Sequence, residues 1–173
     1  MTTPPLISVI VPLKDERDSL AGVVHEINQA LEALGESWEI LLVDDGSTDG
    51  TWQAIEALAR EDERIVGLRF ARNCGQTAAL SAGFDYSRGQ IIIPIDGDGQ
   101  NDPADIVRLR AKLEEGYDVV SGWRRHRRDA ALSRRLPSML ANRLISLVSG
   151  VRLHDYGCTL KAYRRDVVKD VRL

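Results

Sequence analysis

Short apolar runs alternate with longer amphipathic segments along most of the chain. The short runs are typical of buried strands, and the longer segments repeat apolar residues every three or four positions, as one face of a helix does. Strands are predicted at residues 7–11, 39–43, 65–70, 90–95 and 119–121, and helices at residues 16–34, 52–60, 76–86 and 103–114. This alternation predicts an α/β domain with a mostly parallel sheet and helices on both faces.

Residues at the helix ends support these boundaries. Gly35 is placed to end the first helix, and the polar cluster 47–49 is placed to open the second. Asp102 is the expected N-cap of the fourth helix, with Pro103 in its first turn. After Gly122 the pattern changes to an arginine-rich loop, a helix predicted at residues 136–148 and a polar, aromatic segment at residues 154–165.

Composition narrows the class of protein. The 173 residues fit one domain, and 43% of them are hydrophobic. A formal net charge of −3 does not favour nucleic acid as a partner, although six arginines lie between residues 124 and 135. The sequence has no apolar stretch near the roughly 18–20 residues that span a bilayer, so the chain as given is expected to be soluble or peripheral.

Polar clusters follow four consecutive predicted strands, at residues 12–16, 44–49, 72–75 and 96–100. In open α/β sheets, ligands bind at the carboxyl ends of the strands. The sequence therefore predicts one binding site at that edge of the sheet.

Two of these clusters are acidic. Asp96 and Asp98, separated by Gly97, offer hard oxygen ligands that suit Mg²⁺ or Mn²⁺, although an Asp-Gly turn without a metal has the same composition. Asp44 and Asp45 could accept hydrogen bonds from a nucleobase or ribose, or could be an acidic cluster favoured by the following helix N-terminus. The residues alone leave both alternatives open.

Six segments in order carry a resemblance to a known family: ISVIVPLKDE, VDDGSTDGT, RNCGQTAALSAG, DGDGQNDP, GWRRHRR and DYGCTLKAYRR. Together they resemble family 2 glycosyltransferases, which have the GT-A fold. The likeness is greatest to enzymes that load a sugar onto a polyprenyl phosphate, such as dolichol-phosphate mannose synthases, bactoprenol glucosyltransferases and undecaprenyl-phosphate aminoarabinose transferases. Mannose synthases often have an aromatic residue where this chain has Lys14.

The resemblance implies a role for individual residues. The residues implied around the donor nucleotide are Pro12, Glu16, Val43, Asp45 and Asp96. Those implied at the metal and diphosphate are Asp96, Asp98 and Gln100. Arg124, with Arg134 or Arg135, would contact the acceptor phosphate, because the planar arginine fork donates two hydrogen bonds at once.

The implied reaction is metal-dependent, inverting transfer of a sugar from a nucleotide sugar to an undecaprenyl or dolichyl phosphate, with UDP favoured over GDP. Asp96, Asp98 and Arg124 would take part in catalysis. An ionised phosphate nucleophile needs no strong base, whereas a hydroxyl acceptor would need one, and Asp155 is the candidate. Transfer to a polysaccharide or other hydroxyl, and nucleotide-sugar binding without turnover, remain as alternatives.

Members of this group usually continue beyond the point at which this chain stops. Residues 1–173 are therefore expected to be a single GT-A catalytic domain that ends before acceptor-site and membrane-associating segments. For the full-length protein, the resemblance implies work on the cytoplasmic side of the membrane and association into homo-oligomers.

Overall fold

The computed structural model describes residues 4–122 and 158–168, and the predicted helix at 136–148 lies outside them. The strands are β1 (Ile7–Leu13), β2 (Trp38–Asp44), β3 (Ile65–Arg69), β4 (Ile91–Pro94), β5 (Val119–Ser121) and β6 (Lys161–Arg164). The helices are α1 (Arg17–Leu34), α2 (Thr51–Glu61), α3 (Gln76–Tyr86), α4 (Asp105–Glu114) and α6 (Arg165–Val168).

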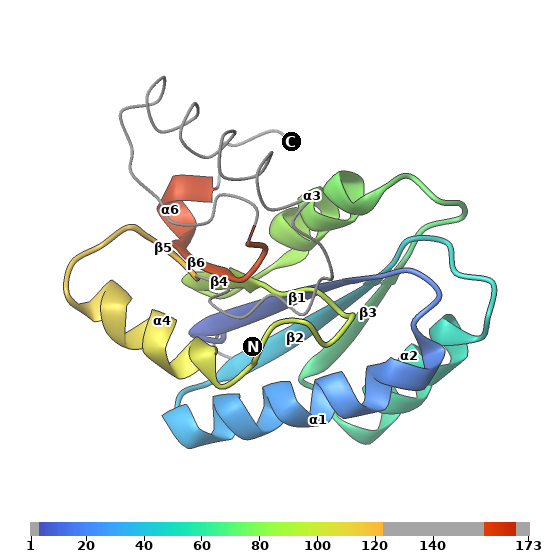
Figure 1. Ribbon diagram of the computed structural model, residues 1–173, viewed down its shortest axis with the longest axis horizontal. Coiled ribbons are helices and arrows are strands. Elements are labelled where there is room, and N and C mark those ends of the chain that lie inside the picture. Colours follow the sequence, from blue (N-terminus) through green and yellow to red (C-terminus); the bar gives the residue numbers. More distant parts are fainter. Residues whose placement is uncertain (1–3, 123–157, 169–173) are drawn as a thin grey trace, which may run out of the picture.

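Within this described part, the six strands form one sheet in the order β3-β2-β1-β4-β6-β5 (Figure 1). Strands β3, β2, β1 and β4 are mutually parallel, and β6 runs antiparallel to both β4 and β5. The carboxyl ends of the parallel strands therefore meet along one edge. The α/β prediction with a mostly parallel sheet is confirmed.

Helices cover both faces of the sheet, with α1, α2 and α4 on one side and α3 and α6 on the other (Figure 1). The larger apolar core lies under α1, where Leu20, Ile27 and Leu31 are fully buried at helical spacing. A smaller cluster under α3 contains Ile10 and Val43. The alternation of side chains along each strand divides its residues between these two cores.

The predicted boundaries agree with the structure to within about two residues, the usual uncertainty of helix and strand ends. Gly35 ends α1 in the left-handed conformation, with a φ of 65°. The expected N-cap of α4 was wrong. Ala104 is the N-cap, and Asp102 accepts a hydrogen bond from the Ala104 N–H in the turn before the helix.

Strand β6 was not predicted. It lies in the sheet between β4 and β5, although it follows both of them in the sequence. Ala162, at its centre, is fully buried. The insertion brings residues 158–160, which precede β6, towards the strand ends that carry the acidic segment 96–98.

Candidate functional site

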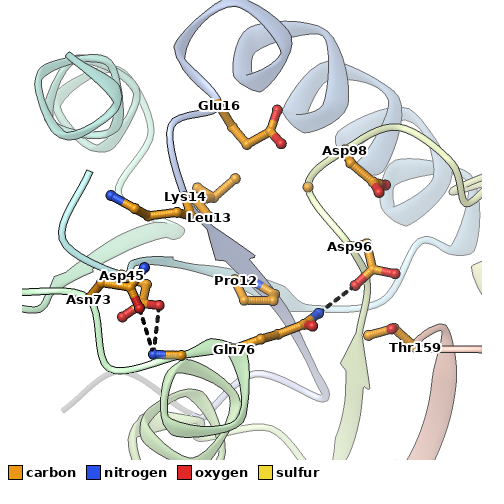
Figure 2. A pocket seen from close by; sticks show the side chains of 12 residues that line it. Pro12, Leu13, Lys14, Glu16, Asp45, Asn73, Gln76, Asp96, Asp98 and Thr159 are labelled. Atoms are coloured by element: carbon orange, nitrogen blue, oxygen red, sulfur yellow. Dashed lines mark hydrogen bonds between the residues drawn. The ribbon is translucent and has the colours of Figure 1, made fainter. Parts of the chain in front are cut away.

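A cavity of about 520 Å³ lies at the carboxyl ends of the parallel strands (Figure 2). It is formed by the segments that follow β1, β2, β3 and β4, together with the segment before β6. Its lining residues are Pro12, Leu13, Lys14, Glu16, Asp45, Asn73, Gly75, Gln76, Asp96, Gly97, Asp98 and Thr159. The predicted site at this edge of the sheet thus coincides with a cavity.

The carboxylate of Asp96 is fixed inside this cavity by two side-chain amides. Gln76 Nε2 donates to Oδ1 at 2.8 Å, as Figure 2 shows, and Asn101 Nδ2 donates to Oδ2 at 3.1 Å. Gly97 follows immediately, and a Cβ there would lie only 2.4 Å from Leu13 Cδ2. Glycine therefore allows the acidic loop to pack closely against the end of β1.

Asp98 lines the same cavity and is exposed, and its Oδ1 accepts a hydrogen bond from the Gln100 N–H at 3.0 Å. Gln100 itself is not a lining residue. Across residues 4–122 and 158–168, no group of three or more His, Cys, Asp or Glu side chains could hold a metal ion. Asp96 and Asp98 fit a divalent cation that takes its remaining ligands from water or from a bound diphosphate.

Asp45 lies at the other end of the cavity and is 4% exposed. Its Oδ1 accepts the Cys74 N–H at 2.6 Å, and its Oδ2 accepts the Gly75 N–H at 2.9 Å. The carboxylate therefore fastens the loop between β3 and α3 to the end of β2. Each oxygen keeps a further lone pair with which it could accept a hydrogen bond from a ligand.

The neighbouring Asp44 has a different environment. It is fully buried, is not a lining residue, and accepts the Ser47 N–H at 2.9 Å in a tight turn. Its other oxygen faces Arg69 Nε at 3.5 Å. Of the two adjacent carboxylates, Asp45 therefore lines the cavity, whereas Asp44 stabilises the turn behind it.

The segment after β1 forms a further wall of the cavity. Lys14 Nζ donates to the Gly46 carbonyl at 2.8 Å, which ties this wall to the loop after β2. Asp15 has a positive φ of 54°, and hydrogen bonds from the Thr48 N–H and then from Lys14 lower the pKa of its carboxyl. The Glu16 carboxylate accepts the Ser19 hydroxyl at 2.5 Å. Lys14, which lines the cavity, thus places a cation where mannose synthases often have an aromatic residue.

The structure gathers Pro12, Glu16, Asp45, Asp96 and Asp98 from the predicted set around one cavity. Val43 is not among the lining residues, because its side chain is fully buried in the apolar cluster under α3. The remaining predicted residues, Arg124, Arg134, Arg135 and Asp155, lie outside the described part of the chain.

Three polar residues of the site were not predicted: Gln76, Asn101 and Thr159. Asn73 belongs to the predicted polar cluster at residues 72–75, and the other three fall within the segments RNCGQTAALSAG, DGDGQNDP and DYGCTLKAYRR. The uncharged polar residues in those segments were the signal from which these site residues could have been predicted.

The family model described as "Glycosyl transferase family 2" matches residues 8–172. This chain belongs to glycosyl transferase family 2. Its relatives include an undecaprenyl-phosphate 4-deoxy-4-formamido-L-arabinose transferase of Shewanella sediminis, 47% identical over 94% of this chain and 49% of the relative. A dodecaprenyl-phosphate galacturonate synthase of Rhizobium johnstonii is 43% identical over 96% of this chain and 50% of the relative. The chain spans about half the length of these curated relatives.

Solved structures agree with the fold. A glucosyl-3-phosphoglycerate synthase from Mycobacterium tuberculosis, in complex with Mn²⁺, UDP and phosphoglyceric acid, matches 96% of this chain and 58% of its own, with a TM-score of 0.74 and 21% identity. A mannosyltransferase from Pyrobaculum calidifontis, in complex with GDP-Man and Mn²⁺, matches 97% of this chain and 47% of its own, with a TM-score of 0.64 and 19% identity. These likenesses confirm the predicted GT-A fold. Among the helices that the structure describes, none has the length and apolar character needed to cross a membrane.

Proposed function

We propose that this chain is the catalytic domain of an inverting glycosyltransferase that moves a sugar from a UDP-sugar to a polyprenyl phosphate. The observation that carries the proposal is the Asp96 carboxylate, held by two amides inside a cavity that also contains Asp98 and Asp45. Two relatives above 40% identity are an undecaprenyl-phosphate 4-deoxy-4-formamido-L-arabinose transferase and a dodecaprenyl-phosphate galacturonate synthase, and both names pair a sugar with a polyprenyl phosphate. The reaction would take place on the cytoplasmic side of a membrane.

The donor would lie along the cavity from Asp45 to Asp98. Pro12, Glu16 and Asp45 would surround the base and ribose, and Asp96 would meet the diphosphate end. Asp96 and Asp98 would hold the Mg²⁺ or Mn²⁺, with Gln100 as a further candidate ligand. A bound cation would neutralise the charge that develops on the leaving diphosphate.

The chemical step would be an in-line displacement. An oxygen of the acceptor phosphate forms a bond to the anomeric carbon, while the bond from that carbon to the diphosphate oxygen breaks. The nucleoside diphosphate leaves with the electron pair, and the configuration at the anomeric carbon inverts. Because the acceptor phosphate is already ionised near neutral pH, the step needs no general base. Arg124, with Arg134 or Arg135, would balance the acceptor charge.

The test measures the release of UDP from a panel of UDP-sugars, in a buffer that contains detergent and Mn²⁺. Each UDP-sugar is assayed with undecaprenyl phosphate, with a soluble polysaccharide and without an acceptor. The assay uses the protein at its natural full length. The proposal predicts UDP release that depends on undecaprenyl phosphate and is lost in Asp96→Asn. UDP release that depends on the polysaccharide would identify a hydroxyl acceptor. Binding of a UDP-sugar with no release of UDP would identify a non-catalytic module. Either result contradicts the proposal.

A further inference from the structure

Hydrogen bonds connect the two ends of the candidate site through the first turn of α3. Asp45 accepts the backbone N–H groups of Cys74 and Gly75, at 2.6 and 2.9 Å. The next residue, Gln76, begins α3, and its side chain crosses the cavity to Asp96 (Figure 2). A carboxylate at the opposite end of the cavity therefore helps to hold the backbone from which the Gln76 side chain extends.

The second oxygen of Asp96 is held from the other side. Asn101, which donates to it at 3.1 Å, is only 6% exposed. The Oδ1 atom of Asn101 lies 3.8 Å from the buried Cys158 Sγ, just before β6. One amide on Asp96 is thus anchored in the protein interior, and the other, from Gln76, reaches it across the exposed side of the cavity.

These two contacts leave Asp96 suited to bind a cation. An ionised carboxylate has about four lone-pair positions, and the two amides use one on each oxygen. The plane of the carboxylate is then fixed, and one lone pair on each oxygen remains for a metal. Carboxylates that bind metals in proteins are commonly oriented by neighbouring hydrogen bonds in this way, and loss of such a partner typically costs about 10–100-fold in metal affinity.

We propose that Gln76 is a positioning residue of the divalent-cation site, which holds the Asp96 carboxylate in the orientation that accepts the cation. The inference rests on the proposed function, because that function supplies the cation. Gln76 has no ligand role in it. Its amide acts through Asp96, and Asp45 supports it by fixing the backbone at Gly75.

Gln76→Met tests this role, because methionine keeps the side-chain length and removes the amide donor. Calorimetric titrations with UDP would be repeated at increasing Mn²⁺ concentrations, on the wild type and the variant. We expect the Mn²⁺ concentration for half-maximal UDP affinity to rise about 10–100-fold. At saturating Mn²⁺, the UDP affinity should return to the wild-type value. Gln29→Met, at an exposed position of α1, is the matched control and should behave as the wild type.

Two results would overturn the inference. If the Mn²⁺ midpoint stays at the wild-type value while UDP affinity falls at every Mn²⁺ concentration, Gln76 contacts the nucleotide directly. If neither quantity changes, the hydrogen bond to Asp96 has no role in cation binding. Failure of the proposed function would be distinct, since the wild type itself would then bind UDP without any dependence on Mn²⁺ or would not bind it.

Discussion

Ser8 Oγ donates a hydrogen bond of 2.6 Å to Oε1 of Glu39, its direct neighbour across β1 and β2. Both side chains are buried, with exposed fractions of 0% and 2%. The same carboxylate accepts the backbone N–H and Nε of Arg88, and Ser8 Oγ accepts the Gly89 N–H. This cluster fastens the connection between α3 and β4 to the centre of the sheet.

Ser8→Ala is expected to lower the free energy of unfolding by about 1–3 kcal/mol, because the buried Gly89 N–H loses its acceptor and Glu39 loses a donor. Urea unfolding at neutral pH measures this. Ser81→Ala removes the same hydroxyl from a half-buried position of α3 and should change stability by less than about 0.5 kcal/mol. Equal effects of the two substitutions would show that the buried cluster adds no stability.

Gly46 permits the close approach of two loops that border the site. Its φ is 67°, and a Cβ there would lie 2.5 Å from the carbonyl carbon of Arg72. Gly35 has a φ of 65° but nothing within 4 Å of the same position, so Gly35→Ala measures the cost of the left-handed backbone alone, about 1–2 kcal/mol.

Gly46→Ala is expected to lower the free energy of unfolding by about 1–3 kcal/mol more than Gly35→Ala, because the added methyl group must push the two loops apart. UDP affinity should fall with it, since the displaced loop carries Asn73 and Gly75, which line the cavity. Calorimetry and urea unfolding on both variants test this. Wild-type UDP affinity in Gly46→Ala would show that the close loop contact does not shape the site.

Asp49 ties the start of α2 to the start of α1. Hydrogen bonds from the Thr51 hydroxyl, and then from the backbone N–H groups of Thr51 and Arg17, lower the pKa of Asp49 from 3.8 to about 2. The folded pKa is below the unfolded one. The stabilising contribution is therefore complete above pH 3.8 and is lost as the pH falls through about 2.

Asp49→Asn should therefore be less stable than the wild type near neutral pH, and the difference should shrink as the pH falls from about 4 to about 2. Urea unfolding at a series of pH values gives this comparison. A difference that stays constant across that range would mean that ionisation of Asp49 does not stabilise the fold.

Much of the site could be predicted because it depends on local signals. Apolar runs located the strands, and the edge at which parallel strands end brought Asp45, Asp96 and Asp98 together. Glycines in those same segments fixed where the backbone turns. The place of the cavity in the fold could therefore be predicted from the sequence, whereas the distances within it could not.

Other features depend on contacts that the sequence does not encode locally. The strand Lys161–Arg164 is short and includes a charged residue at each end, so only its pairing between β4 and β5 identifies it. Val43 was predicted to lie near the nucleotide, and its side chain packs in the apolar cluster under α3, a contact that depends on how this helix is placed on the sheet. The contact between Gln76 and Asp96 depends on side-chain orientation across twenty positions of sequence, which no periodicity reveals.

The most direct test of the proposed function is the binding of UDP and GDP by calorimetry, with and without Mn²⁺, to the wild type and to Asp98→Ala. The proposed function predicts that the wild type binds UDP more tightly than GDP, that binding is tighter with Mn²⁺, and that Asp98→Ala loses the effect of Mn²⁺. The protein should be measured at its natural full length as well as over residues 1–173. If the folded protein binds neither nucleotide in the presence of Mn²⁺ at either length, or if Asp98→Ala binds UDP with the same Mn²⁺ dependence as the wild type, the proposed donor site is contradicted.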